Sequence, residues 1–281
     1  MSKEKPAEEV PLEALNPYEL RVNLGTKVSE SAVQAALRTG DVGFLHSFTT
    51  GSTVDGPGVR VVAWTSGCQF RCLYCHNPDT WNMMNGMPVT LERAIEALGK
   101  YRHGLRIMSG GFTLSGGEPL MQDRFAARLL TRAKAIGIHT ALDTNGFLGE
   151  RLSDQELDQI DVVLLDIKTW DSVRHQRLTG KDVGPTLDFA RRLADRKRTI
   201  WLRYVLVPGL TDDVDDINQT ATFAAGLGNV QRVDVLPFHQ MGRYKWKKLG
   251  INYTLDNVSA PSPELIERVC RQFTAVGLKA Y

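Results

Sequence analysis

The chain has 281 residues, of which 34 are lysine or arginine and 32 are aspartate or glutamate, so its net charge is +2. This balance gives no general reason to expect nucleic acid or an anionic membrane as a partner, and the length suits one large α/β domain. The charged start has no apolar core and no apolar run approaches a membrane span, so we expect a cytoplasmic protein with reduced cysteines.

Residues 1–40 differ in character from the rest of the chain. Pro6, Pro11 and Pro17 punctuate a mixed-charge stretch with little periodicity. We therefore expect an N-terminal extension that is mostly irregular and mobile, with one short helix at residues 31–37. Residues 41–281 are expected to form the folded domain.

From Val42 onward, apolar strands alternate with helices. The expected strands are residues 59–65, 112–114, 139–142, 162–167, 199–207 and 230–236, and the expected helices are residues 91–101, 123–136, 185–196, 215–227 and 263–276. Thr90 can cap one helix, and Ser153 with Glu156 forms a capping box at the start of another. Six strand–helix units predict a parallel sheet, and because a closed barrel needs eight, we expect a partly open (βα)6 barrel.

Polar residues and glycines gather where the predicted strands end. They are Gly116, Gly117, Glu118, Asp143, Asp166, Lys168, Arg203 and His239. The C-terminal ends of parallel strands meet at one edge of a sheet, and α/β folds place their sites there. A cysteine-rich loop follows the first of these strands, so it opens on the same edge.

Three of the four cysteines lie in that loop: Cys68, Cys72 and Cys75, with the spacing C-x3-C-x2-C. Three thiolates could hold three irons of a 4Fe–4S cluster and leave the fourth iron open to another ligand. Zinc is a second interpretation, with His76 or Cys270 as the fourth ligand, but a structural zinc site usually has two separated ligand pairs. The loop also fits the haem-attachment pattern C-x-x-C-H, which usually requires export. The spacing favours iron–sulfur over zinc, and zinc over haem.

Together these residues resemble the radical S-adenosylmethionine superfamily, through the cluster motif with Tyr74 before its last cysteine and through the segment 115–119, Ser-Gly-Gly-Glu-Pro. Further segments are similar to the activases of glycyl-radical enzymes: residues 53–60, 72–77, 142–146, 165–168, 203–209 and 236–239. The resemblance covers about residues 43–281. Many of these activases carry further cysteines after the cluster motif, and their absence between Cys75 and Cys270 favours the type that acts on pyruvate formate-lyase.

The resemblance implies a reaction. A reduced 4Fe–4S cluster would pass one electron to S-adenosylmethionine, which would break into methionine and a 5′-deoxyadenosyl radical. That radical would take a hydrogen from a backbone glycine of pyruvate formate-lyase or a similar glycyl-radical enzyme, under anaerobic conditions. The implied electron donor is a flavodoxin-like protein.

The resemblance also implies roles for single residues. Cys68, Cys72 and Cys75 would hold the cluster. Asp55, His76 and Arg203 would act as catalytic residues that contact the glycine loop of the partner. The residues implied to bind the cofactors are Tyr74, Cys75, His76, Gly116, Gly117, Glu118, Asp143, Thr144, Asp166, Ile167, Lys168 and His239. A monovalent cation is implied near Asp143 and Asp166.

Other interpretations stay open from the sequence alone. Gly116 and Gly117 could form a plain tight turn, Asp166 and Lys168 a surface ion pair, and His239 a structural contact. A related radical enzyme could act on another glycyl-radical enzyme or on a small molecule. A protein of a different class, a zinc-binding adaptor without catalysis, is the third hypothesis. Cys270, in the last predicted helix, is expected to be a small buried hydrophobe.

Overall fold

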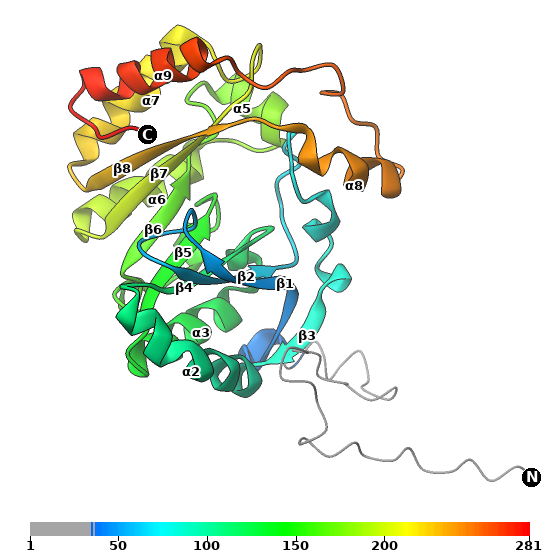
Figure 1. The fold of residues 1–281 in the computed structure, drawn as a ribbon, viewed down its shortest axis with the longest axis vertical. Coiled ribbons are helices and arrows are strands. Elements are labelled where there is room, and N and C mark those ends of the chain that lie inside the picture. Colours follow the sequence, from blue (N-terminus) through cyan, green and yellow to red (C-terminus); the bar gives the residue numbers. More distant parts are fainter. Residues whose placement is uncertain (1–34, 36) are drawn as a thin grey trace, which may run out of the picture.

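The structure is a computed structural model that describes residues 35 and 37–281 (Figure 1). The helix predicted at residues 31–37 and the mobility predicted for residues 1–40 lie largely outside the described residues, so both stay predictions. Within the described part, no helix is long and apolar enough to cross a membrane.

One eight-stranded sheet, in the order β3-β1-β2-β4-β5-β6-β7-β8, organises the described residues. Six of its strands are mutually parallel: β2 (Arg60–Thr65), β4 (Gly111–Gly116), β5 (His139–Thr144), β6 (Val162–Asp166), β7 (Thr199–Leu206) and β8 (Val230–Pro237). They are the six strands that the sequence predicted. The two ends of the sheet, β3 and β8, do not pair, so the predicted open (βα)6 barrel is confirmed.

Two antiparallel strands that the sequence analysis did not predict extend this sheet. β1 (Val42–Ser52) pairs with β2, and β3 (Met87–Thr90) pairs with β1. Only the first four residues of β1 are fully buried, and its second half is polar and more exposed. The hydrophobic pattern that marks a core strand is therefore confined to one short run, which explains why the sequence did not reveal β1.

Helices cover the outside of the curved sheet (Figure 1). The long ones are α2 (Leu91–Ile107), α3 (Asp123–Ala135), α6 (Gly184–Asp195), α7 (Val214–Leu227) and α9 (Pro263–Ala275), and the short ones are α4 (Asp154–Leu157), α5 (Ser172–Thr179) and α8 (Arg243–Lys248). Short 3-10 turns are Pro78–Thr80, Met83–Asn85, Pro119–Gln122, Gly149–Arg151 and Gln240–Gly242. Both predicted caps are present, at Thr90 and at Ser153 with Glu156, although the second helix is a single turn. The sequence analysis did not predict α5 and α8.

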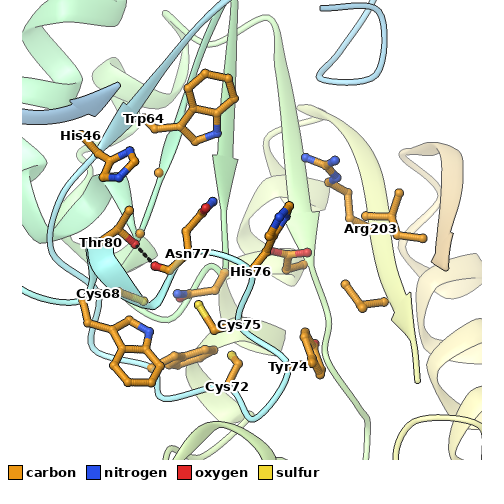
Figure 2. Close-up of a pocket in the computed structure, with 18 of the residues that line it drawn as sticks. His46, Trp64, Cys68, Cys72, Tyr74, Cys75, His76, Asn77, Thr80 and Arg203 are labelled. Atoms are coloured by element: carbon orange, nitrogen blue, oxygen red, sulfur yellow. Dashed lines mark hydrogen bonds between the residues drawn. The ribbon is translucent and has the colours of Figure 1, made fainter. Parts of the chain in front are cut away.

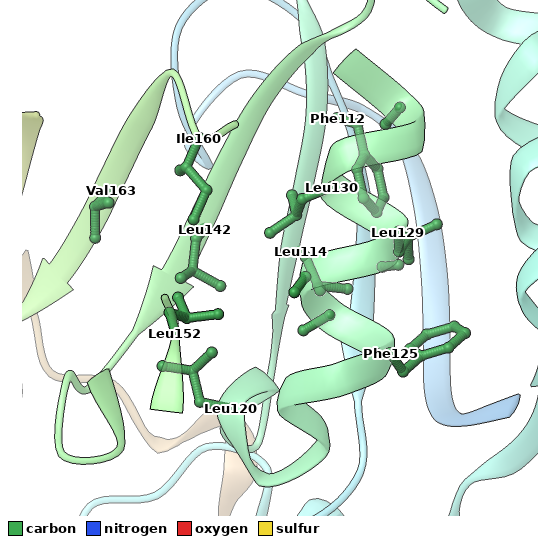
Figure 3. Close-up of a cluster of buried hydrophobic side chains, with 14 of the residues drawn as sticks. Phe112, Leu114, Leu120, Phe125, Leu129, Leu130, Leu142, Leu152, Ile160 and Val163 are labelled. Carbon is green, nitrogen blue, oxygen red and sulfur yellow. The ribbon is translucent and has the colours of Figure 1, made fainter. Parts of the chain in front are cut away.

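Three larger apolar clusters, and a small fourth one of Ala141, Val162 and Leu164, hold these layers together. The largest lies between the first half of the sheet and helices α2 and α3, and Figure 3 shows Phe112, Leu114 and Leu130 among its members. A second packs α7 and α9 on β7 and β8. The third joins the cysteine loop, through Phe70 and Cys72, to α5 and the end of β8. Each fully buried Leu or Phe in these clusters contributes about 1.5–3 kcal/mol, so packing holds the cysteine loop firmly in place.

Candidate active site

A hollow of about 810 Å³ lies inside the curve of the sheet (Figure 2). The predicted site residues whose atoms line it are Asp55, Cys68, Cys72, Tyr74, Cys75, His76, Gly116, Gly117, Asp166, Lys168, Arg203 and His239. Four other predicted residues, Glu118, Asp143, Thr144 and Ile167, are not part of this lining. The side chain of Ile167 is fully buried in the second apolar cluster, so only its backbone could contact a ligand.

The cysteine loop is fixed by backbone hydrogen bonds at both ends. The N–H of Cys68 donates to the carbonyl of Trp81 at 3.2 Å, and that of Cys75 donates to the carbonyl of Cys72 at 3.0 Å. Between them, the N–H of Arg71 donates to the carbonyl of Thr179 at 2.7 Å, which ties the loop to the end of α5. The three thiols therefore sit on a segment whose shape is set before any ligand binds.

Helix α8 fastens the loop from the other side. The indole N–H of Trp246 donates to the carbonyl of Cys75 at 2.8 Å, and its ring packs edge-on against Trp81 at 5.2 Å. The ammonium of Lys245 donates to the side chains of Asn77 and Asp79 at 2.7 and 3.1 Å. Sequence reasoning missed these two residues of α8 because a six-residue helix gives too short a pattern to recognise.

The three thiols suit an iron–sulfur cluster. Burial raises the pKa of Cys72 to about 12 and also raises the pKa values of Cys68 and Cys75, so the free thiols are protonated at neutral pH. The charge of bound metal is what would make them thiolates. Among the described residues, no three His, Cys, Asp or Glu side chains converge on a point where one ion could sit. A cube of four irons takes thiolates that are further apart than one zinc ion does, so this geometry favours the cluster.

The two glycines at the end of β4 are required by the protein's own backbone. A Cβ on Gly116, whose φ is +143°, would lie 2.2 Å from the backbone nitrogen of Thr65. A Cβ on Gly117 would lie 2.5 Å from the carbonyl oxygen of Gly67 and 3.1 Å from the Cβ of Cys68. The missing side chains thus let the end of β4 touch the cysteine loop, and both glycines also line the hollow.

Glu118 lies outside the lining of the hollow and connects two turns of the site by hydrogen bonds. Its carboxylate is fully buried and accepts hydrogen bonds from the N–H of Leu120 at 3.0 Å, the hydroxyl of Thr144 at 2.7 Å and the N–H of Asn145 at 2.8 Å. Burial raises the pKa of Glu118 to about 7, although these three donors pull it down. The residue therefore orders the turns after β4 and β5.

Replacing Glu118 with glutamine is expected to destabilise the fold by about 2 kcal/mol at pH 6, below the raised pKa of the native carboxyl, where both side chains are largely neutral and the substitution relieves no buried charge. The new amide nitrogen would face at least one of the three donors and leave it without an acceptor. Denaturant unfolding of the metal-free protein measures this, with Glu156→Gln as the control. Glu156 is only half-buried and glutamine also serves in a capping box, so the control should lose only a few tenths of a kcal/mol. Equal losses in both variants would contradict the role assigned to Glu118.

A buried charge network crosses the hollow. Arg203 contacts Asp143 at 2.9 Å and Asp55 at 3.5 Å, while Lys168 contacts Asp166 at 2.8 Å. All five side chains are 20% exposed or less, so the Asp166–Lys168 contact is no surface ion pair. Burial raises the pKa of Asp143, and Arg203 only partly offsets this. Burial works to lower the pKa of Arg203, but the surrounding carboxylates outweigh it and the net shift is upward.

The prediction that Arg203 lies at the C-terminal end of its strand is wrong. Arg203 lies within β7, three residues before the strand's last residue, Leu206, and so not at the strand's C-terminal end. Its guanidinium reaches the hollow because the parallel register sets it beside Asp166 of β6. The other predicted strand-end residues in this network, Asp143 and Asp166, do lie at or within one residue of the ends of their strands.

Asp55 reaches the hollow from a turn that precedes β2, at the N-terminal end of that strand. It belongs to the turn 53–59 of the β1–β2 hairpin, and this turn packs so tightly that a Cβ on Gly58 would lie 2.0 Å from the carbonyl oxygen of Ser109. The fully buried Arg60 donates to the hydroxyl of Thr113 at 2.9 Å, and that hydroxyl donates to the carbonyl of Asp55 at 2.6 Å. This chain of contacts fixes the backbone that carries Asp55.

Two more polar residues of the lining were missed by sequence reasoning. Asn145 accepts hydrogen bonds at its Oδ1 from the N–H of Phe147 and the side chain of Gln69, which leaves its amide nitrogen for the hollow. His46 contacts Asp79 at 2.9 Å. The signal for Asn145 was present in the Asp-Thr-Asn-Gly turn after β5, whereas His46 lies on the strand that the sequence did not reveal. His76 and His239, both predicted, meet edge to face at 4.8 Å.

Comparisons with known proteins agree with this geometry. The family model described as Radical SAM superfamily matches residues 62–224. The pyruvate formate-lyase 1-activating enzyme of Escherichia coli K12 is 42% identical over 230 residues, 81% of this chain and 94% of that protein. The pyruvate formate-lyase-activating enzyme of Staphylococcus epidermidis is 43% identical over 236 residues, 82% of this chain and 94% of that protein.

Solved structures give the same picture for the fold. A crystal structure of a domain of pyruvate-formate lyase-activating enzyme from Bacteroides vulgatus matches with a TM-score of 0.50 and 28% identity, over 61% of this chain and 98% of that chain. Streptococcus suis SuiB matches with a TM-score of 0.58 over 78% of this chain and 48% of that chain. At 14% identity, the second match supports the barrel fold alone.

Proposed function

The chain belongs to the radical S-adenosylmethionine superfamily, and within it to the pyruvate formate-lyase activating enzymes, and on that premise we propose that it installs a glycyl radical on pyruvate formate-lyase. The observation that carries the proposal is the meeting of three thiols, one buried and two half-buried, and the Arg203 charge network in one hollow. A zinc adaptor without catalysis would have no use for that network. The similarity to activating enzymes extends over four fifths of the chain, which favours this partner over a small molecule.

Membership of the family implies a 4Fe–4S cluster and S-adenosylmethionine. When bound, they supply the one-electron cleavage that generates the radical. Cys68, Cys72 and Cys75 would hold the cluster. Cys270 lies in α9, outside the lining of the hollow, so three thiols serve the site and the fourth does not.

The residues around the hollow would orient the bound molecules and keep water out. Lys168, held by Asp166 at 2.8 Å and 5.7 Å from the ring centre of Tyr74, offers a fixed ammonium to a carboxylate of the ligand. The carboxylate of Asp166 can accept hydrogen bonds from ribose hydroxyls. The other predicted contacts around this ligand, His239 and the two glycines among them, are part of the same proposal.

Asp55, His76 and Arg203 would receive the glycine loop of the partner. The guanidinium of Arg203 is already fixed by two carboxylates, and its remaining N–H groups can donate to the carbonyls of an extended peptide. Its Nε is buried and has no hydrogen-bond partner within the described residues. Such a donor supports a role in binding, because a buried N–H without an acceptor is costly unless a ligand supplies one.

Three further parts of the proposal concern the surroundings of the site. A monovalent cation near Asp143 and Asp166 is supported by their proximity, since the charge of Asp166 raises the pKa of Asp143. A flavodoxin-like protein is the proposed electron donor, and the cytoplasm is the proposed location. Both fit a chain whose thiols must stay reduced.

Anaerobic reconstitution tests the proposed function. We expect about four irons and four sulfides per chain, and deoxyadenosine when the reduced protein meets S-adenosylmethionine. Electron paramagnetic resonance should then detect a glycyl radical on added pyruvate formate-lyase. Zinc in place of iron would overturn the superfamily chemistry. Deoxyadenosine without a radical on that partner, but with one on another glycyl-radical enzyme, would reassign the substrate alone.

A further inference from the structure

The cysteine loop has a second face that the site does not use. Its thiols line the hollow, but the exposed Arg71 between them does not. The guanidinium of Arg71 donates to the carbonyls of Cys68 and Phe70, both at 2.7 Å, and lies 5.0 Å from the ring centre of Trp81. A single layer of loop backbone therefore separates this exposed cation from the cluster ligands.

Further basic residues lie on the two elements to which the loop is bonded. The loop runs between α5 and α8 (Figure 1), bonded to the end of α5 through the carbonyls of Leu178 and Thr179 and to α8 through Trp246. The end of α5 carries Arg177, with Lys181 just beyond it, and the end of α8 carries Lys247 and Lys248. We call these five side chains, Arg71, Arg177, Lys181, Lys247 and Lys248, the basic face. None of the five lines the hollow.

The charge of the basic face is not neutralised by the protein. None of its five side chains forms an ion pair within the described structure, although many other surface cations do. The neighbouring carboxylates are already engaged, Asp79 by His46 and Lys245, and Asp256 by Arg243. Asp182 is exposed, and it accepts the N–H of Gly184. In a chain with a net charge of only +2, this is a local concentration of positive charge beside one loop.

The proposed function requires an electron at the cluster for each turnover. Bound S-adenosylmethionine and the peptide of the partner would fill the inner side of the loop. We propose that the basic face docks an acidic one-electron carrier protein, whose electron crosses the cysteine loop from outside. The inference rests on the proposed function, because only that function places a redox centre under the loop. The reduced carrier loses one electron, the cluster gains it, and no bond forms or breaks.

The variant Lys247→Glu/Lys248→Glu tests the basic face without touching the loop, because neither side chain has a hydrogen bond or ion pair in the described structure. Stopped-flow absorbance at low ionic strength measures the rate at which an acidic flavodoxin reduces the reconstituted cluster. This rate should be about tenfold lower in the variant than in the native protein. The native rate should fall steeply with added salt, and the variant rate should depend on salt much less. Titration of oxidised flavodoxin against the metal-free protein should show the same loss of affinity.

Two controls make the result decisive. Arg102→Glu/Arg106→Glu reverses two exposed charges on α2, remote from α8 (Figure 1), and should reduce as the native protein does. Dithionite, which needs no docking surface, should reduce the native protein and both variants equally and support deoxyadenosine formation in all three. An unchanged rate of reduction by flavodoxin in Lys247→Glu/Lys248→Glu would overturn the proposal. If this variant lost only the transfer of the radical to pyruvate formate-lyase, the proposal would also fail, and the basic face would be assigned to that partner. If dithionite gave no deoxyadenosine in the native protein, the proposed function itself would fail.

Discussion

Cys72→Ala is expected to give a folded protein that holds no 4Fe–4S cluster and forms no deoxyadenosine. Two thiolates cannot retain a cube whose third protein ligand is missing. The side chain is small and belongs to the third apolar cluster, so its loss removes about 1 kcal/mol of packing. Iron and sulfide analysis with circular dichroism separates loss of the cluster from loss of the fold.

Cys270→Ala is the matched control for that experiment. Cys270 is half-buried in α9, packs against the second apolar cluster and does not line the hollow. The variant should keep about four irons per chain and the native yield of deoxyadenosine. Loss of the cluster in Cys270→Ala would make this cysteine a fourth ligand, leave no open iron for S-adenosylmethionine and so refute the assignment of the site.

The parallel part of the barrel could be predicted because each of its strands contains a short run rich in apolar residues. β6 is the clearest case, since its first four residues are buried on both faces of the sheet, whereas β7 alternates between buried and half-buried residues. β1 could not be found in the same way, because only its first four residues form a buried run and the rest are half-buried or exposed. Helices α5 and α8 are too short to show periodicity, and it is their contacts with the cysteine loop that hold them.

The candidate site, too, could be predicted from the sequence only in part. The cysteine spacing predicted the proposed metal ligands, since thiolates are few and their separation along the chain limits what they can hold. The approach of Asp55 to Arg203 could not be predicted, because it depends on a hairpin turn that folds inward from the far edge of the sheet. The buried hydrogen bonds of Arg60 and Thr113 hold this turn in place. The residues around Asp55 show no local sequence pattern that predicts these hydrogen bonds.

Arg203→Gln is expected to combine a loss of stability with a loss of radical transfer. The substitution leaves Asp143 buried without its partner cation, and breaking a buried pair in this way costs about 3 kcal/mol. The peptide loop of the partner also loses the donor that would position it, so radical formation on pyruvate formate-lyase should fall by about 100-fold or more. Cleavage of S-adenosylmethionine without the partner should persist, because the thiols and Lys168 are unchanged.

The pH dependence of this deficit identifies its cause. Burial raises the pKa of Asp143, and without Arg203 the pKa rises further. A carboxyl whose folded pKa is raised is destabilising only when ionised, so the deficit of Arg203→Gln should be full above that raised pKa and shrink as the pH falls through it. Denaturant unfolding of the metal-free proteins at a series of pH values measures this. The double variant Arg203→Gln/Asp143→Asn removes the stranded charge and should recover much of the stability at neutral pH, but not the radical transfer. If the double variant were no more stable than Arg203→Gln, the buried Asp143–Arg203 pair would not be what Arg203 stabilises.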